Sequence, residues 1–324
     1  MANDESMIVK FWGVRGSIPA PMTEEEYLKK LEKDTPSKHG TFYGGDTTCI
    51  EVRAKDAPLI VIDAGSGARN LGNYLLTRQF NGQNFNPLDS EAARKRDINM
   101  FFTHYHWDHI QGFPFFAPAF IPGENRAKVH FYGKKNAKVR LSHVLAFQQQ
   151  YPNFPIEWGA MPCDKKYTEL GRMAPSPIKL GNATVTYAEL DHPDRVFGYA
   201  VEVEGKKFVC ATDTEHRDFV DPQLVKLAKG ANILYYDAQY TPDEYEGRKG
   251  MPKVRWGHST YEWAIKTAIA ADAKCVVLGH HDPSHDDFKL DEIKERAINF
   301  KIETAGVFRT LQVIMAYQGL EQRI

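Results

Sequence analysis

Cysteine is scarce in this chain of 324 residues: Cys49, Cys163, Cys210 and Cys275 form no close pair and no C-x-x-C motif. The first residues, MANDESMIVKFW, lack the order of basic, apolar and small residues that marks a secretory signal. These absences predict reduced thiols and a cytoplasmic protein. Long apolar runs are missing as well. None approaches the roughly 18 to 20 residues that span a bilayer, so we exclude an integral membrane protein and expect no membrane partner.

A charge excess of either sign is also absent, since 41 Lys and Arg residues are balanced by 42 Asp and Glu residues. Proteins that coat nucleic acid usually carry a basic excess, because Lys and Arg neutralise the phosphates. A small substrate is therefore favoured over a long nucleic acid. The basic clusters are interpreted as solvated faces, with a path for phosphates as the less favoured alternative. They contain Arg94, Lys95, Arg96, Lys134, Lys135, Lys138 and Arg140.

Short runs rich in β-branched and aromatic residues recur along the chain and predict strands. They lie at 7–12, 49–53, 58–63, 98–103, 183–190, 197–204, 207–212, 232–237, 275–279 and 310–317. Apolar residues with helical periodicity are found near 24–33, 137–150, 221–230, 259–272 and 287–299. In the stretch 259–272, Ser259 and Glu262 form the pattern of a capping box at the helix start.

The interleaving of strands and helices predicts the α/β fold class. No long linker or low-complexity tract divides the chain, so we expect one domain over residues 1–324. Two stretches stand out as insertions in this domain, near 20–40 and at 113–180, and 113–180 is irregular and proline-rich enough to form a lid or a subdomain. The second is rich in proline and aromatic residues, and we favour a place in the core or in a dimer contact over a lid on the substrate.

The densest group of chemically active side chains is HYHWDH at 104–109, directly after the apolar run INMFFT. Residues two apart on an extended chain share a face, so His104 and His106 can bind one cation. The turn after them directs Asp108 and His109 at a second cation. A solvated polar loop is the alternative, but three imidazoles at a strand end repel one another when they are protonated. A metal site is therefore the favoured interpretation.

Four more candidates also follow apolar strands: Asp63, His192, Asp213 and His280. In α/β proteins, sites form where the ends of strands meet at one edge of a sheet. Each residue alone is a weak signal, because an Asp before a Gly is often only a turn former. Their repeated position after strands predicts that they join the HYHWDH cluster in one site.

The motif H-x-H-x-D-H, with these four residues placed around it in the same order, resembles the motif set of the metallo-β-lactamase superfamily. The resemblance covers about residues 7–285. It implies a four-layer αββα sandwich that binds two divalent metal ions, usually Zn²⁺, with Mn²⁺ or Fe²⁺ as alternatives. It also implies that Asp63 does not bind a metal ion itself but orients the residues that do. The implied ligands are His104, His106 and His192 for one ion, Asp108, His109 and His280 for the other, and Asp213 as a bridge.

The segment WGHST at 256–260 resembles an element of the phosphodiesterase branch of that superfamily. This branch includes the tRNA 3′-end endonucleases and the phosphoribosyl cyclic phosphodiesterases. The resemblance implies that His258 contacts the scissile phosphate or protonates the leaving oxygen, and that His258, Asp108 and Asp213 are catalytic. A place just before a helix start suits an anion, while a surface residue beside a helix cap is the alternative. Weaker resemblances to bacterial members of the branch lie at 13–17, 43–48 and 280–283.

One departure from the tRNA endonucleases concerns the stretch between His192 and Asp213. Those enzymes typically carry a long arm there that grips the tRNA, whereas FGYAVEVEGKKFVCAT fills this stretch as a hairpin that turns at 204–206. We therefore expect hydrolysis of a small cyclic nucleotide or a related cyclic phosphodiester by a hydroxide that bridges two metals. One alternative is an RNA or tRNA 3′-processing endonuclease. A second is a metal-stabilised ligand-binding protein without turnover. The resemblance is also compatible with a homodimer.

The remaining histidines carry no comparable signal. His281 and His285 are near the site in sequence, but a polar loop explains them equally well. The others have no spacing that marks them as ligands: His39, His130, His143 and His216.

Overall fold

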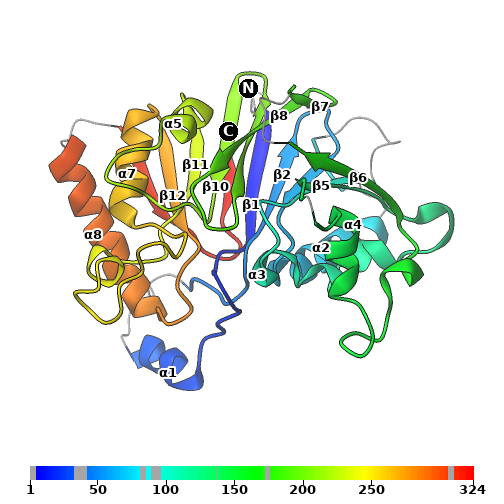
Figure 1. Ribbon diagram of the computed structural model, residues 1–324, viewed down its shortest axis with the longest axis horizontal. Helices are drawn as coiled ribbons and strands as arrows, with labels where there is room; N and C mark the ends of the chain where they lie inside the picture. The colour runs from blue at the N-terminus through cyan, green and yellow to red at the C-terminus, as the bar shows by residue number, and fades with distance from the viewer. Residues whose placement is uncertain are drawn as a thin grey trace.

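Two β-sheets packed face to face form the centre of the protein, and helices cover their outer faces. The computed structural model describes residues 5–32, 42–80, 85–88, 96–136, 138–171, 176–305 and 310–324. Within these ranges each sheet has seven strands. Figure 1 shows the sheets at the centre with helices on both sides. The four-layer αββα sandwich implied by the resemblance is confirmed.

The first sheet is mixed. Its strands β14, β1, β2 and β3 pair antiparallel, and β3, β4, β5 and β6 pair in parallel. Their bounds, in spatial order, are β14 (Glu321–Arg323), β1 (Met7–Gly13), β2 (Cys49–Ala54), β3 (Leu59–Ile62), β4 (Asp97–Phe101), β5 (Lys128–Lys134) and β6 (Asp164–Leu170).

The second sheet is mixed as well. Its strands β7, β8, β9 and β10 pair antiparallel, and β10, β11, β12 and β13 pair in parallel. Their bounds are β13 (Gln312–Met315), β12 (Cys275–Gly279), β11 (Ile233–Asp237), β10 (Lys206–Ala211), β9 (Val196–Val203), β8 (Ala183–Leu190) and β7 (Ile178–Leu180).

Helices form the two outer layers. On the first sheet lie α2 (Gly67–Phe80) and α4 (Leu141–Phe147), and on the second lie α5 (Pro222–Ala228), α7 (Tyr261–Ala270) and α8 (Asp287–Ala305). Two single turns, α3 (Trp107–Ile110) and α6 (Pro242–Tyr245), come after strand ends, and α1 (Glu24–Glu32) lies apart from both layers in Figure 1. None of the described helices is long and apolar enough to cross a membrane.

Both faces of the central strands are buried, which explains why their sequences are continuously apolar. In β12, Cys275 and Val277 belong to the cluster between the sheets, whereas Val276 and Leu278 belong to the cluster under the helices. Strand β3 divides in the same way between the inner and outer clusters. Each buried Val or Leu side chain contributes about 1.5–3 kcal/mol.

The sequence patterns miss four strands, β5, β6, β7 and β14. Strands β5 and β6 lie in the stretch 113–180, so this stretch supplies part of the first sheet. Strand β6 reads DKKYTEL and is largely accessible at the sheet edge, which hides its pattern among polar residues. From the same stretch, Phe113 and Phe116 are fully buried against the outer face of this sheet, while Phe115 is 57% exposed.

The capping box expected at Ser259 and Glu262 is wrong. Helix α7 has Thr260 as its N-cap and no side-chain hydrogen bond at that cap. The hydroxyl of Ser259 lies 2.8 Å from Nδ1 of His216 instead. The hairpin turn expected at 204–206 is confirmed, since β9 ends at Val203 and β10 begins at Lys206.

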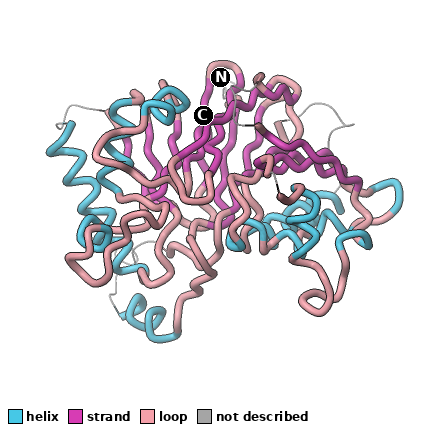
Figure 2. The backbone as a smooth tube through the Cα atoms, viewed as in Figure 1, coloured by secondary structure: helices cyan, strands magenta, loops and turns pink. Residues whose placement is uncertain are grey.

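The six strands that lead into the candidate site residues all end at the same edge of the sandwich. Strands β3 and β4 are parallel in the first sheet, and β8, β10, β11 and β12 run in one direction in the second. Figure 2 shows loops gathered along this lower edge. The residues directly after these strand ends build the site.

Candidate metal centre

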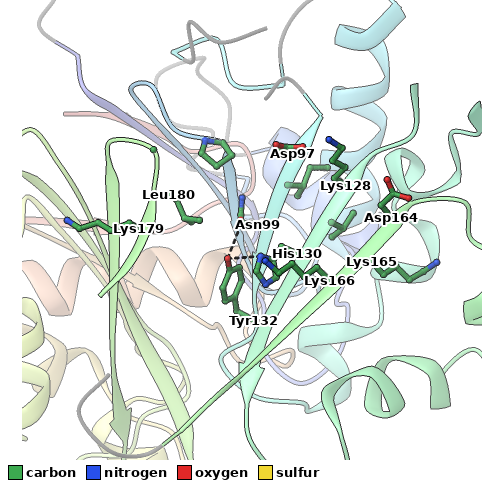
Figure 3. Close-up of a pocket in the computed structure, with 14 residues that line it drawn as sticks. Asp97, Asn99, Lys128, His130, Tyr132, Asp164, Lys165, Lys166, Lys179 and Leu180 are labelled. Atoms are coloured by element: carbon green, nitrogen blue, oxygen red, sulfur yellow. Dashed lines mark hydrogen bonds between the residues drawn. The ribbon is translucent and has the colours of Figure 1, made fainter. Parts of the chain in front are cut away.

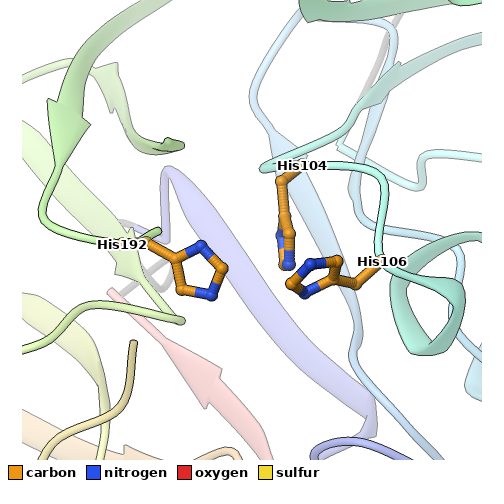
Figure 4. Close-up of side chains that lie close together, drawn as sticks. All are labelled: His104, His106 and His192. Carbon is orange, nitrogen blue, oxygen red and sulfur yellow. The ribbon is translucent and has the colours of Figure 1, made fainter. Parts of the chain in front are cut away.

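All seven ligands implied by the sequence meet at this edge. Within each of four overlapping groups of His and Asp residues, one ligand atom per residue lies within 4.8 Å of the others. The first group is His104, His106 and His192, which converge from opposite sides in Figure 4. The other three groups are drawn from His104, Asp108, His109, Asp213, Asp237, His258 and His280.

Asp213 lies between the two halves of the cluster. The first half is His104, His106 and His192, and the second half is Asp108, His109 and His280. Its Oδ1 is 3.8 Å from Nε2 of His104, and its Oδ2 is 3.2 Å from Nε2 of His109 and 3.3 Å from Nε2 of His280. The two oxygens of one carboxylate therefore face different sets of imidazoles. This geometry suits the bridging role implied by the resemblance.

Asp108 belongs to the second half. Its Oδ2 is 3.2 Å from Nε2 of His109 and 3.5 Å from Nε2 of His280, and it accepts a hydrogen bond of 2.8 Å from the backbone N–H of Ser17. The loop around Ser17 packs directly on this half. A Cβ at Gly16 would lie 2.6 Å from the ring of His280, so only glycine leaves room for the ring.

Three of the strand-end residues have left-handed backbone conformations. The φ angles are +60° at Asp63, +53° at Asp213 and +58° at His280. This region is uncommon for residues other than glycine and costs of order 1–3 kcal/mol at each position. The chain turns sharply after each strand, and these side chains therefore remain at the sheet edge beside the site.

Asp63 lies behind the predicted ligand His109 and contacts its ring. It is fully buried and accepts hydrogen bonds from the backbone N–H and the hydroxyl of Thr103, both at 2.8 Å. Its Oδ2 is also 2.8 Å from Nδ1 of His109. Because the carboxylate accepts the Nδ1 proton, Nε2 of His109 is free to face a metal ion.

Asp194 was not identified from the sequence, yet it contacts two ligands. Its Oδ2 is 2.6 Å from Nε2 of His106, and its backbone N–H donates to Nδ1 of His192 at 3.2 Å. These contacts leave Nδ1 of His106 and Nε2 of His192 as the nitrogens available to a cation. An Asp in a short polar loop carries no distinctive sequence signal.

Asp237 was also missed, although it ends the apolar run NILYYD as the other candidates end theirs. It is fully buried, and its Oδ2 accepts the backbone N–H of Asp213 at 3.0 Å. The same oxygen lies 2.8 Å from Nδ1 of His258. The strand-end rule applied to this run would have found it.

The loop before His258 is held by the buried carboxylate of Glu215. This carboxylate accepts hydrogen bonds from the backbone N–H groups of Arg255 and Gly257 and from the hydroxyl of Tyr245. Gly257 has a φ of +88°, and a Cβ there would lie 2.1 Å from the ring of His192. The WGHST segment is thereby packed against the predicted ligand His192.

The donor set fits metal ions. Nε2 of His104 is buried and has no hydrogen-bond partner among the described residues, although unpaired buried polar atoms are costly. Burial lowers the pKa of His104 well below its usual range and lowers that of His192 to about 4. Both rings are therefore neutral at physiological pH and keep a lone pair for a cation.

In the second half of the cluster, the buried carboxylates need a positively charged partner. Burial raises the pKa of the Asp213 carboxyl, but the imidazoles of His109 and His280 outweigh it and leave the pKa well below the ordinary value. Conversely, burial lowers the pKa of His280, but Asp213 and Asp108 raise it to a net value of about 9. Buried carboxylates that need a positive partner are suited to binding a cation.

A separate hollow lies away from these residues. It has a volume of about 530 Å³ and opens where β4, β5 and β6 begin, at the opposite ends of these strands from the metal ligands (Figure 3). In it, His130 lies 2.8 Å from the hydroxyls of both Tyr132 and Thr168. Both ring nitrogens of His130 therefore have partners within the first sheet. No group of metal-competent residues is described there.

Three other histidines outside the predicted ligand set also have local partners. His281 lies 2.8 Å from the carbonyl oxygen of Ala316, His285 lies 3.0 Å from a carboxylate oxygen of Glu244, and His143 packs on Phe147. His39 is outside the described residues.

Comparison with known proteins places these features in a family. Residues 58–281 match the model described as the beta-lactamase superfamily domain. Ribonuclease Z of Myxococcus xanthus is 25% identical over 226 residues, which cover 58% of this chain and 71% of that protein. Other matching curated proteins are named ribonuclease Z or ribonuclease BN.

Solved structures share the whole architecture. YhfI from Bacillus subtilis, a metallo-β-lactamase fold protein, superposes with a TM-score of 0.62 at 16% identity and covers 99% of this chain and 100% of its own. A diphosphatase from the PhnP family superposes with a TM-score of 0.61 at 16% identity, over 98% of each chain. At these identities the structures show a common fold. The family match spans more than half of the 324 residues and contains every one of the implied ligands, and this chain belongs to the metallo-β-lactamase superfamily.

Proposed function

We propose that this protein is a metal-dependent phosphodiesterase that hydrolyses a small cyclic nucleotide or a related cyclic phosphodiester. The observation that carries the proposal is the position of His258 beside the converging metal ligands. Its ring centroid lies 5.0 Å from that of His280 and 6.1 Å from that of His192. A phosphodiester with a poor leaving group needs both a source of activated water and an acid.

The donor set of imidazoles and carboxylates favours zinc, with Mn²⁺ or Fe²⁺ as alternatives. When bound, two such ions lower the pKa of water and neutralise the phosphoryl oxygens. The residues that would hold them are His104, His106 and His192 on one side, Asp108, His109 and His280 on the other, and Asp213 facing both.

His258 supplies the proton for the leaving oxygen. Asp237 holds its Nδ1 at 2.8 Å, so the other ring nitrogen carries the proton that is transferred. The contact with Asp237 also fixes the orientation of the ring. Because Asp237 binds the backbone N–H groups of both Asp213 and Ser259, the acid and the metal ligands share one rigid support.

The small substrate is supported by the hairpin between His192 and Asp213. Strands β9 and β10 are joined by a tight turn at Glu204 and Gly205, both with positive φ. This stretch holds no long arm that could grip a folded RNA. The nearly neutral net charge of −1 also argues against a surface built for long nucleic acid.

A turnover screen of metal-replete protein tests the proposal. The substrates are cyclic mononucleotides, cyclic dinucleotides, linear dinucleotides and precursor tRNA. We expect the highest kcat/KM with a cyclic mononucleotide. Full metal content without turnover of any phosphodiester would contradict the proposal and support a ligand-binding protein stabilised by metal.

The second candidate is an RNA or tRNA 3′-processing endonuclease, which the names of the curated relatives favour. It would need a gripping surface other than an arm at the β9–β10 turn. It predicts a steep loss of affinity as salt rises, because several phosphates must be neutralised at once. A single cyclic phosphodiester shows only a shallow dependence, so titration at two salt concentrations separates the two candidates.

A further inference from the structure

We propose that a basic hollow beside the metal centre binds a second phosphate group of the substrate. This inference rests on the phosphodiesterase function proposed above and adds a subsite to it. The basic hollow has a volume of about 380 Å³, and four of its lining residues are basic: Lys134, Lys135, Lys138 and Arg195.

The basic hollow shares a wall with the metal centre. Asp194 lines it, and the carboxylate of Asp194 lies 2.6 Å from Nε2 of the ligand His106. Arg195 comes three positions after the ligand His192, which limits the distance between their Cα atoms to about 11 Å. One small molecule can therefore place a phosphodiester at the metal centre and a second phosphate in the hollow.

The acidic groups near the hollow are already engaged. Asp194 contacts His106, a carboxylate oxygen of Glu189 lies 3.9 Å from Nε of Arg195, and Glu169 accepts the backbone N–H of Leu141. By contrast, neither Lys135 nor Lys138 has an acidic partner among the described residues, and both are exposed. Two cationic side chains thus remain to meet an anion.

Lys134 has a different task. Its ammonium donates hydrogen bonds to the backbone carbonyl oxygens of Asp194 and Arg195, the latter at 3.0 Å. These bonds tie the end of β5 to the loop that carries His192. The wall between the hollow and the metal centre is therefore fixed, and a ligand that spans it meets a preorganised surface.

The sequence alone favoured a solvated face for these lysines. Only the fold brings Arg195, from the loop between β8 and β9, to the lysines after β5. The result is a concave basic surface beside a phosphodiester site. Lys and Arg bind phosphate through charge-assisted hydrogen bonds. The second phosphate is either a monoester on the same nucleotide or the next internucleotide diester.

Three probes test the inference and separate these two sources. The first is adenosine 2′,3′-cyclic phosphate. The second is the same compound with a 5′-phosphate, and the third is adenylyl-adenosine 2′,3′-cyclic phosphate, whose extra charge is an internucleotide diester. We expect at least one of the two larger probes to have about tenfold higher kcat/KM, mainly through a lower KM, as one charged hydrogen bond provides.

Two double variants with the same change in net charge complete the experiment. In the first, Lys135→Glu and Lys138→Glu reverse the charge of the basic hollow. In the control, Lys226→Glu and Lys274→Glu act on exposed lysines of α5 and of the β12 start, at the opposite end of that strand from His280. We expect the preference for the second phosphate to be lost in the first double variant and kept in the control.

The outcomes separate the subsite from the proposed function. Hydrolysis of all three probes without a preference overturns the subsite and leaves the proposed function intact. A preference that survives the Lys135 and Lys138 substitutions also overturns the subsite. Hydrolysis of none of the probes overturns the subsite if the screen above finds another cyclic phosphodiester that is turned over, and overturns the proposed function itself if the screen finds none.

Discussion

At the scale of single residues, the chemistry of the site depends on which ring nitrogen of each imidazole is left free to face its centre. Three rings have Nδ1 held within 2.9 Å of an oxygen, which leaves Nε2 toward the centre. A partner that accepts the Nδ1 proton fixes both the tautomer and the ring orientation. The partners are Asp63 for His109, Gln239 for His280 and Asp237 for His258.

Replacing Asp213 with Asn tests the bridging role. The shape of the side chain is kept, but the charge that faces His104, His109 and His280 is lost. We expect kcat to fall at least about 100-fold together with metal content, as for damaged metal sites generally. Measurements are kcat and the bound metal per chain. The matched control is Asp218→Asn, an exposed residue nearby; wild-type kcat in Asp213→Asn would refute the role.

Replacing His258 tests the acid. We expect His258→Ala to keep both metal ions but to lower kcat by about 10²–10⁴ for an alkoxide leaving group, the usual contribution of a positioned acid. A nitrophenolate leaving group needs no proton, so its rate should change little. His258→Asn keeps a donor near the buried Asp237 and should behave alike. Equal losses with both leaving groups would speak against proton donation.

At the scale of elements, the site depends on the sharp turns at the ends of the strands. Asp63, Asp213 and His280 take left-handed conformations directly after β3, β10 and β12. Glycines then allow neighbouring loops to approach the ligands closely. Gly16 packs on His280 and Gly257 packs on His192.

Gly257→Ala isolates this close packing from backbone strain. Gly257 and Gly250 both have positive φ, +88° and +99°, so alanine costs about 1–2 kcal/mol of strain at either position. Only at Gly257 would the added Cβ meet a ligand, since the space at Gly250 is open. We expect Gly257→Ala to lose metal affinity and activity, and Gly250→Ala to keep both. Metal titration and kcat are the measurements, and equal affinity in the two variants would contradict this packing role.

At the scale of the whole molecule, the metal centre joins the two sheets. The loop after β4 carries His104, His106, Asp108 and His109, whereas the second sheet contributes ligands after β8, β10 and β12. Ions bound here would therefore act as cross-links between the halves of the sandwich. The site therefore needs both sheets to bring its residues together, and ions in the site would in turn hold the sheets together.

Metal removal should consequently destabilise the fold. A ligand present at 100 times its Kd contributes about 2.7 kcal/mol by mass action, and unpaired buried groups such as Nε2 of His104 remain when it is removed. We expect a chelator to lower the Tm by several degrees and added Zn²⁺ to restore it. Calorimetry with and without chelator measures this, and an unchanged Tm would be inconsistent with the cross-link.

Local patterns predict much of the sheet architecture. Runs such as PLIVID and CVVLG are buried on both faces, so their composition alone indicates central strands. Strand β6, at an edge, and the three-residue strands β7 and β14 carry weaker patterns, because solvent or short length relaxes the demand for apolar residues. The capping box at Ser259 failed because His216, distant in sequence, competes for that hydroxyl.

The amino-acid sequence by itself predicted the candidate ligand set, since the H-x-H-x-D-H cluster and the residues at strand ends place suitable donor atoms at particular positions. Only the tertiary structure decided which groups support them. Asp194, Asp237 and Glu215 act through contacts with residues far along the chain. The basic hollow likewise forms only when Arg195 meets the lysines after β5. Such partners depend on distances in space, which local sequence patterns do not encode.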